Sequence, residues 1–368
     1  MNALRAMIFG NLLHRPLRTI ITVVAVGAEV CLVVLIVGLT TGVLQETAKR
    51  IEGVGADLML QPPASNFLLA FGGAPMPIKI QEKLDELPHV AAVAPVLVQF
   101  HTSGGLDTVY GIDLGRFNRV SHGFAYHAGG PFEKPTDVLV DDWYAAAKKL
   151  KVGDTLRLFE NNFTVRGIVE HGKGARLFVP IERLQELSAA HDKASLFFIR
   201  VDNPENIEAV SEEIRQLFPR HKLQPVREFF TMMTSSRLPG LDTFVNSMIA
   251  LGVAVGFLVI FLAMYTTILE RTREIGILKS LGSSNFDIIA LVLRESLLLC
   301  AMGAALGVGF SFGSKALLKE AFPTLTILIT TGWLLKASLL AVVSGALGAA
   351  YPAWLAARQD ALVALAYE

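Results

Sequence analysis

Residues 244–268 read FVNSMIALGVAVGFLVIFLAMYTTI, a stretch that holds no charged side chain. A helix of about 20 apolar residues crosses the ~30 Å hydrocarbon core of a bilayer, and this stretch exceeds that length. Residues 20–41, 288–313 and 333–355 have the same apolar character. The sequence therefore predicts an α-helical membrane protein with four transmembrane helices.

The composition limits the chemistry of the chain. Only 18% of the residues are charged, and the formal net charge is zero. Because no basic field is present to attract nucleic acid, we expect no nucleic-acid partner. The sequence has no phosphate-binding loop and no Gly-x-Ser-x-Gly elbow, and His122 and His127 lack a second ligand pair at zinc spacing. We predict no catalytic residue, no cofactor site and no metal site in this chain.

Basic residues gather on one side of the four stretches, and the positive-inside rule uses them to set the orientation. This side holds Arg15 and Arg18 before the first stretch, Arg271, Arg273 and Lys279 between the second and third, and Arg358 after the fourth. The rule predicts that both termini are cytoplasmic and that the long segment after the first helix lies outside the cytoplasm.

The predicted organisation follows from these assignments. It comprises a cytoplasmic amphipathic N-terminal helix at 1–19, transmembrane helices at 20–42, 243–268, 288–313 and 333–356, an extracytoplasmic domain at 43–242, a cytoplasmic segment at 269–287, an extracytoplasmic loop at 314–332 and a cytoplasmic tail at 357–368.

The extracytoplasmic domain is predicted to have an α+β fold. Its first part has the pattern of a strand at 56–60, a helix at 78–87 and a strand at 90–100. Its last part repeats this order with a strand at 196–201, a helix at 204–218 and a strand at 222–226. The repetition indicates a split α/β module at 56–110 and 195–226 with an inserted lobe at 111–194. Within the lobe, the polar residues 160–162 between two apolar runs predict a hairpin turn.

One apolar stretch between prolines has two interpretations. Its large side chains are Phe67, Leu68, Leu69 and Phe71. The simpler interpretation is a loop that packs on its own domain, as most apolar segments do. The alternative is an exposed loop that contacts membrane lipid, a lipidated substrate or a partner protein.

Glu29 lies near the middle of the first transmembrane stretch. A carboxylate at that depth costs about 3 kcal/mol on insertion scales, so we expect it to face protein or water. It is either a functional group, at a seam between two permease subunits or in a cavity wall, or a protonated or hydrogen-bonded structural glutamate.

Glycines recur at four-residue spacing in the second and third stretches, in the pairs Gly252/Gly256, Gly303/Gly307 and Gly309/Gly313. Such spacing permits close helix contact in lipid. We interpret the pairs as packing positions within the bundle or between two copies, although glycine is also generally common in membrane helices.

The segment between the second and third stretches, ERTREIGILKSLGS at 270–283, is rich in charge. Ile275, Leu278 and Leu281 form an apolar stripe at helical spacing. The residues alone are equally consistent with a positive-inside anchor that presents a solvated charged face.

This segment resembles the "REIGILKALG" signature of the MacB/LolC/FtsX-type ABC transporter permease family. The identical positions include Glu274, Ile275, Gly276, Leu278, Lys279, Leu281 and Gly282, and Ser280 replaces the usual alanine. The segments NLLHRPLRT at 11–19, GADL at 55–58 and YPAWLAAR at 351–358 also resemble family motifs. Asp360-Ala361 stands where the family commonly has Asp-Pro.

The resemblance implies four spans, a porter-like split module and a sabre-like inserted lobe. It also implies that the cytoplasmic segment is a coupling helix that docks into an ATPase subunit. The residues carried over to that contact are Glu270, Arg271, Arg273, Glu274, Ile275, Gly276, Leu278, Lys279 and Leu281.

The partners implied are a dimer of ABC ATPase subunits, a second permease subunit in a homo- or heterodimer, membrane lipid and a periplasmic adaptor. MacB itself carries a fused ATPase domain. Since this chain shows none, the resemblance implies a non-catalytic subunit, with ATP and Mg²⁺ bound by a separate ATPase. The implied location is the bacterial cytoplasmic (inner) membrane.

Two functions remain as hypotheses. The first is a permease that transmits ATPase-driven motion to the extracytoplasmic domain, for efflux or for extraction of a lipid, lipoprotein or other periplasmic substrate. The second is an FtsX-like mechanotransmitting regulator of a cell-wall hydrolase. The length of the extracytoplasmic domain favours the first, because FtsX-type domains are usually smaller.

Overall fold

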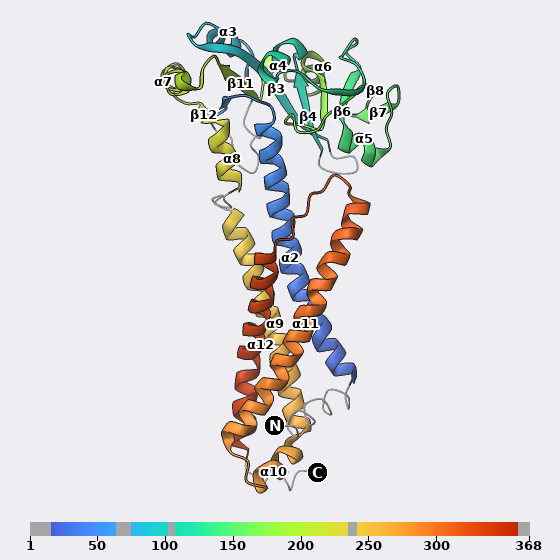
Figure 1. Ribbon diagram of the computed structural model, residues 1–368, viewed down its shortest axis with the longest axis vertical. Helices are drawn as coiled ribbons and strands as arrows, with labels where there is room; N and C mark the ends of the chain where they lie inside the picture. Colours follow the sequence, from blue (N-terminus) through green and yellow to red (C-terminus); the bar gives the residue numbers. More distant parts are fainter. Residues whose placement is uncertain (1–15, 64–74, 102–106, 235–240, 360–368) are drawn as a thin grey trace. The chain divides into compact units, whose positions relative to one another are not determined.

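The computed structural model describes residues 16–63, 75–101, 107–234 and 241–359 (Figure 1). The chain forms two compact units. The helical unit comprises Met1–Thr41, Pro239–Leu318 and Ile327–Glu368, and the α/β unit comprises Gly42–Leu238 and Lys319–Thr326. The predicted N-terminal amphipathic helix falls largely outside the described residues.

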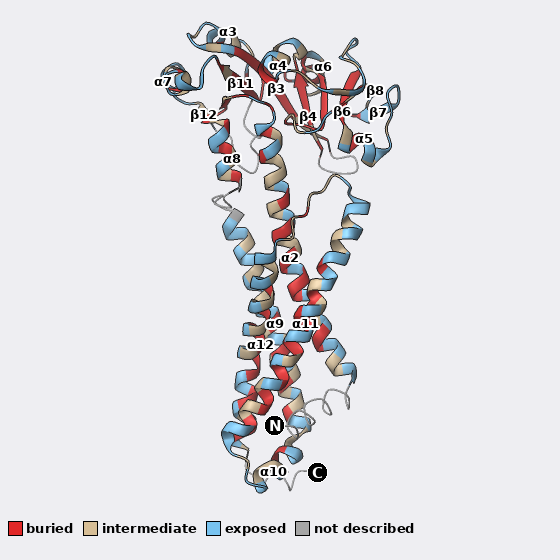
Figure 2. Ribbon diagram, in the orientation of Figure 1, coloured by how far each residue is buried: buried red, intermediate tan, exposed pale blue. Residues whose placement is uncertain are grey.

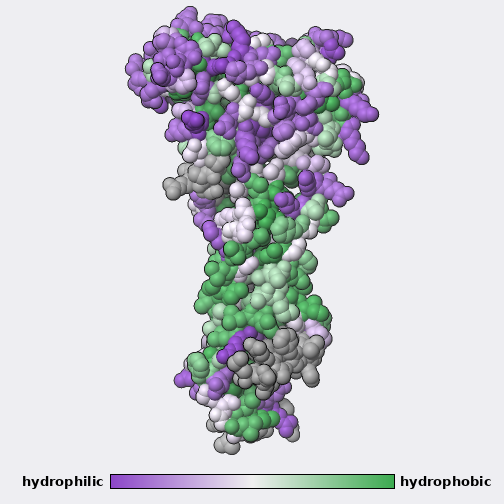
Figure 3. Space-filling model, in the orientation of Figure 1, coloured by the Kyte–Doolittle hydropathy of each residue, from purple (hydrophilic) through white to green (hydrophobic). Residues whose placement is uncertain are grey.

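Four helices in the described part of the chain are long and apolar enough to cross a membrane. They are α2 (Pro16–Glu52), α9 (Leu241–Glu270), α11 (Asn285–Ala321) and α12 (Thr331–Arg358). Figure 3 shows a band of apolar residues around the middle of these helices and mostly hydrophilic residues over the α/β unit. Helix α2 begins at Pro16, a residue that favours the first turn because its missing N–H has no helical partner there.

Glycines allow the long helices to approach closely. A Cβ added to Gly307 of α11 would lie 2.5 Å from the carbonyl oxygen of Gly27 in α2. A Cβ added to Gly348 of α12 would lie 2.7 Å from the carbonyl oxygen of Phe257 in α9. Two predicted glycine pairs, at 252/256 and 303/307, therefore lie at helix contacts. The third, Gly309/Gly313, has open space at both Cβ positions and does not pack within the bundle.

The α/β unit is built on a ten-stranded sheet in the order β12-β1-β11-β3-β4-β9-β6-β8-β5, with β7 paired to β8. The strands are β1 (Leu58–Gln61), β3 (Val90–His101), β4 (Asp107–Ile112), β5 (Tyr126–Gly129), β6 (Asp137–Asp141), β7 (Thr155–Leu158), β8 (Asn161–Val169), β9 (Leu177–Pro180), β11 (Leu196–Val201) and β12 (Lys222–Pro225). Strands β2 (Met76–Pro77) and β10 (Lys193–Ala194) form a separate pair.

The terminal parts of the domain and the segment 111–194 contribute to one continuous sheet. The terminal parts supply β12, β1, β11, β3 and β4. The segment 111–194 supplies the remaining strands, which join through the parallel pair β4–β9, where Val109 lies opposite Leu177. The lobe is therefore an extension of the same sheet.

The hairpin between β7 and β8 turns earlier than the sequence predicted. Its turn residues are Phe159 and Glu160, which both have positive φ, at 48° and 60°. Two such residues match the twist of the flanking strands. The side-chain amide of Asn161, the first residue of β8, donates to the Phe159 carbonyl at 2.7 Å. The predicted hairpin is confirmed, but its turn lies at 159–160 instead of 160–162, because Asn161 and Asn162 belong to β8.

Helices cover both faces of the sheet. The short helices are α3 (Ile80–Asp85), α4 (Leu114–Ser121), α5 (Asp142–Lys148), α6 (Ile181–Leu187), α7 (Ile207–Leu217) and α8 (Val226–Thr234), with a 3₁₀ turn at Pro204–Asn206. Leu58 and Leu60 pack in the same cluster as residues of α3 and α7, whereas Met59 packs with residues of α4 and α8 on the opposite face. Figure 2 shows the resulting buried strands in red.

Candidate functional site

The segment that follows α9 forms a short helix of its own. Arg271 has φ −110° and leaves the helical conformation, and α10 (Thr272–Ser280) begins directly after it. Gly282, with φ +97°, then reverses the chain in a conformation that favours glycine. Ser284 and Asp287 exchange hydrogen bonds between side chains and backbone N–H groups, at 3.0 and 3.3 Å, which starts α11 as a reciprocal cap.

Arg271 joins α10 to the bundle. Its Nε donates to Glu274 at 2.8 Å, and its Nη1 donates to Glu295 of α11 at 3.3 Å. Glu295 is buried, so the arginine supplies the counter-charge that a buried carboxylate needs. The structure therefore brings together two predicted coupling residues and adds Glu295, which lies inside an apolar run and was not predicted.

Lys279 joins the other end of α10 to α12. Its ammonium donates to the backbone carbonyls of Ala357 at 2.6 Å and of Gln359 at 2.8 Å. The last carbonyls of a helix have no intrahelical partner, and a lysine there satisfies them and complements the helix dipole. Helix α10 is thus held near its N-terminus by Arg271 and at its C-terminal turn by Lys279.

A third polar contact joins α2 to α9. The Arg18 guanidinium donates to both carboxylate oxygens of Glu270, at 2.7 and 2.6 Å, and to the Thr267 hydroxyl at 3.0 Å. A single guanidinium nitrogen, Nη2, makes both contacts with Glu270, and both side chains are partly exposed, so we expect a modest contribution from this ion pair. Each of the four long helices is therefore linked, through chain or contact, to residues 267–280.

The outer face of this segment carries apolar side chains. Ile275 and Gly276 are buried in the bundle, and Leu278 is half-buried. The exposed apolar residues are Ile277, Leu281 and Phe286, at 44%, 78% and 77% of their full surface. We call these three residues the outer apolar residues; Arg273 and Glu274 are also exposed.

The outer apolar residues differ from the stripe that the spacing predicted. Of the three stripe residues, only Leu281 points outward, because Ile275 and Leu278 anchor α10 to the bundle. Ile277 and Phe286 were missed by the sequence analysis. Phe286 is the second residue of α11, after the Gly282-Ser283-Ser284 turn and Asn285, and a large apolar residue in the first helical turn after such a break was the available signal.

Glu29 is buried among the membrane helices, and its Oε2 has no hydrogen-bond partner in the described part of the chain. Its carboxylate lies against Gly256 of α9, where any added Cβ would overlap it. Its functional role stays a prediction. The proposed lipid or substrate contacts Phe67, Leu68, Leu69 and Phe71 lie outside the described residues.

Comparison with known proteins identifies two family models in the chain. A model described as the MacB-like periplasmic core domain matches residues 19–217. A model described as the FtsX-like permease C-terminal region matches residues 246–361.

Individual relatives have low sequence identity to this chain, but their alignments cover much of it. The chain is 26% identical to the macrolide export ATP-binding/permease protein MacB of Hahella chejuensis, over 96% of this chain and 58% of that protein. It is 24% identical to an uncharacterised ABC transporter permease of Methanocaldococcus jannaschii, MJ1507, over 82% of this chain and 80% of that protein. The periplasmic region of MacB from Actinobacillus actinomycetemcomitans aligns at TM-score 0.39 and 15% identity, covering 50% of this chain and 96% of that chain.

The first family model alone covers more than half of the chain, and the second covers α9 to α12. This chain spans little more than half the length of the Hahella protein, 58%. With four apolar helices and an α/β domain, the chain belongs to the MacB/FtsX-type family of ABC transporter permeases.

Proposed function

We propose that this chain is the permease subunit of an ABC transporter and transmits ATPase-driven motion to its α/β unit. The observation that carries the proposal is the set of outer apolar residues, Ile277, Leu281 and Phe286, exposed on a segment that is anchored at both ends. Exposed apolar residues with charged neighbours are typical of protein interfaces.

The contacts around α10 give this motion a route. A displacement of α10 would reach α9 through the chain, α11 through Arg271–Glu295 and α12 through Lys279. Arg18 and Glu270 would extend it to α2. Helix α2 continues to Glu52, and its last turns are part of the α/β unit.

Several parts of this proposal concern partners. The ATPase would be a separate subunit dimer that binds ATP and Mg²⁺, and the permease would pair with a second permease subunit. The termini and α10 would lie in the cytoplasm, with the chain in the bacterial inner membrane. The substrate would be an efflux cargo, or a lipid, lipoprotein or other periplasmic molecule handled with or without a periplasmic adaptor.

Regulation of a cell-wall hydrolase, as in FtsX-like proteins, is the second candidate. The FtsX-like match over residues 246–361 is compatible with both functions. The MacB-like match over residues 19–217 favours transport. A purified complex that binds no hydrolase but responds to an exported compound would decide for transport.

The role of the outer apolar residues can be tested with two exposed leucines. Leu281→Asp places a charge among the outer apolar residues, whereas Leu317→Asp places one on α11 at a residue that is similarly exposed, 70% against 78%. We expect Leu281→Asp to lose binding of the ATPase subunit and Leu317→Asp to retain it, in co-purification and ATPase assays in nanodiscs. Normal ATPase binding by a correctly inserted Leu281→Asp protein would refute the proposal.

A further inference from the structure

The C-terminal end of α2 is built into the core of the α/β unit. Ala48, Ile51 and Val54 are fully buried in the cluster that includes the sheet residues Met59 and Phe198. Gly53, just after the helix, lies against the carbonyl of Gly172 so closely that a Cβ at residue 53 would overlap it. The turn that contains Gly172 therefore rests directly on the end of the helix.

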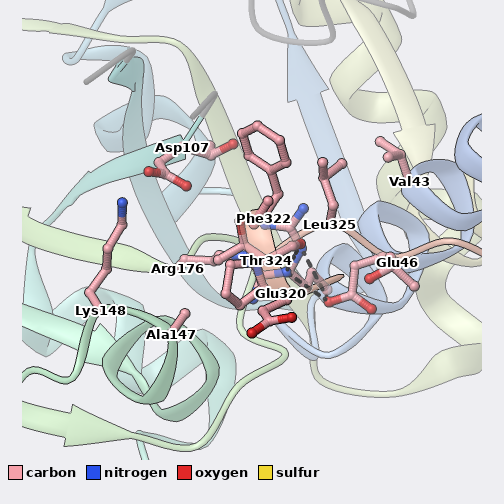
Figure 4. Close-up of a pocket in the computed structure, with 15 residues that line it drawn as sticks. Val43, Glu46, Asp107, Ala147, Lys148, Arg176, Glu320, Phe322, Thr324 and Leu325 are labelled. Atoms are coloured by element: carbon pink, nitrogen blue, oxygen red, sulfur yellow. Dashed lines mark hydrogen bonds and ion pairs between the residues drawn. The ribbon is translucent and has the colours of Figure 1, made fainter. Parts of the chain in front are cut away.

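Arg176 follows this turn and contacts three different parts of the α/β unit, two of which, Glu46 and Thr324, are drawn in Figure 4. Its Nη1 lies 3.3 Å from Asp141 Oδ2 at the end of β6, and its Nη2 lies 3.7 Å from Glu46 Oε1 of α2. Nη2 also donates to the backbone carbonyl of Thr324 at 3.1 Å. Thr324 belongs to the segment Lys319–Thr326, which holds the last residues of α11 and the first part of its connection to α12 and is part of the α/β unit.

The guanidinium is held in place from several directions. The Arg176 side chain is only 5% exposed, and its guanidinium carbon lies 5.7 Å from the centre of the Trp143 ring. Asp141 is itself fixed, because it caps α5 by accepting from the Tyr144 N–H at 2.6 Å. A buried arginine with two carboxylates and a carbonyl around it is a specific arrangement, since an unpaired charge there would be costly.

Packing alone leaves the connecting segment loosely supported. A cavity of about 530 Å³ lies beside it, lined among others by Phe322, Leu325, Val43 and Lys148. Figure 4 shows Arg176 and Glu46 close to Thr324, while Asp107 and Lys148 lie farther along the cavity. Because the cavity removes apolar contacts from this segment, the polar contact with Arg176 supplies a larger share of the interactions that hold the segment in place.

We propose that Arg176 is a positioning residue that clamps the α11–α12 connection and the end of α2 to one corner of the α/β unit. With this clamp, the extracytoplasmic domain follows movements of α11 and α12 as well as those of α2. The consequence for transport rests on the proposed function, whereas the clamp itself is a property of the free chain. The clamp therefore gives the domain a second place, the 319–326 segment, at which it receives movement of the membrane helices.

The clamp is tested in the full-length chain in nanodiscs by amide hydrogen exchange. Arg176→Met removes the donors and keeps much of the apolar stem. Arg183→Met is the matched control, because Arg183 pairs with Glu186 on the surface of α6. We expect exchange in residues 319–326 to rise about tenfold in Arg176→Met, from the loss of a charge-assisted hydrogen bond, and to stay unchanged in Arg183→Met. Exchange in β1 and β11, which lie far along the sheet from Asp141 and Asn161, should not change in either variant.

Wild-type exchange in residues 319–326 of Arg176→Met would overturn the clamp. If Arg176→Met does not fold, Arg176→Lys takes its place, because lysine keeps the charge with fewer donors. Faster amide exchange in residues 319–326 of that variant supports the clamp, and wild-type exchange there overturns it. ATPase binding is measured on the same samples. A chain that binds no ATPase yet shows the local increase would refute the proposed function and leave the clamp standing.

Discussion

The ammonium of Lys279 lies 2.6 Å from the carbonyl oxygen of Ala357, so the end of α10 is bonded to the end of α12 across a sequence separation of 78 residues. This contact gives the cytoplasmic segment a fixed orientation. It also explains why a lysine at this position serves the fold of the permease itself, in addition to any role at an ATPase surface.

Lys279→Met should therefore destabilise the membrane bundle. Two carbonyls at the end of α12 lose a charged donor, and we expect a loss of about 1–3 kcal/mol in unfolding free energy. Lys134→Met, at an exposed lysine of the α/β unit, is the control and should be neutral. The measurement is denaturant unfolding in mixed micelles. Equal stability of the two variants would mean that the Lys279 contacts contribute nothing net.

Gly256→Ala should destabilise the chain because the new methyl group overlaps the Glu29 carboxylate. Overpacking of this kind costs about 1–3 kcal/mol. The double variant Glu29→Ala/Gly256→Ala should recover part of the loss, since the obstructing side chain is gone. Gly309→Ala is the matched control in another membrane helix, with open space around its Cβ position. Thermal unfolding of the three variants and the parent protein tests the contact, and unchanged stability of Gly256→Ala would contradict it.

Asp141 should make the α/β unit more stable at mildly acidic pH. Burial raises the pKa of this carboxyl from 3.8 to about 6, although Arg176 acts in the opposite direction. The folded state then retains a proton that the unfolded state releases. The unfolding free energy should therefore fall as pH rises from about 4 to about 6, by at most ~1.4 kcal/mol per pH unit.

This slope is measurable in the full chain through Trp143 fluorescence, after Trp333→Phe and Trp354→Phe remove the other two tryptophans. Asp141→Asn should flatten the slope. Burial also raises the pKa of Asp107, so part of the dependence should remain. Identical slopes in the Asp141→Asn and parent proteins would exclude Asp141 as the titrating group.

The orientation of the chain can be read by thiol labelling. Both native cysteines, Cys31 and Cys300, are buried, so they should give little background. Leu281→Cys should react with a membrane-impermeant maleimide only after the inner membrane is opened, whereas Lys134→Cys should react in intact spheroplasts. The reverse pattern would place α10 outside the cytoplasm and remove the basis for ATPase docking.

Local patterns predicted the separate elements well. The strand at 196–201 was predicted at its observed bounds, because a short apolar run between turn residues is typical of a buried strand. The helix predicted at 204–218 forms as a 3₁₀ turn followed by α7 at Ile207–Leu217. Hydrophobic length alone identified the four membrane helices.

Contacts between distant residues could not be predicted in the same way. The parallel pairing of Val109 with Leu177 merges the lobe into the sheet, and no local pattern encodes that register. Arg176 and Thr324 are 148 residues apart, and each is unremarkable in its own segment. The direction in which Ile277 points depends on which face of α10 the bundle covers, which only the packed structure decides.

The close fit of Gly53 on the carbonyl of Gly172 has a consequence for how the domain is driven. Because this contact has no room for a methyl group, we expect the end of α2 and the Gly172 turn to move together. Rotation of α2 about its own axis would therefore be passed to the sheet, in addition to movement of α2 along that axis.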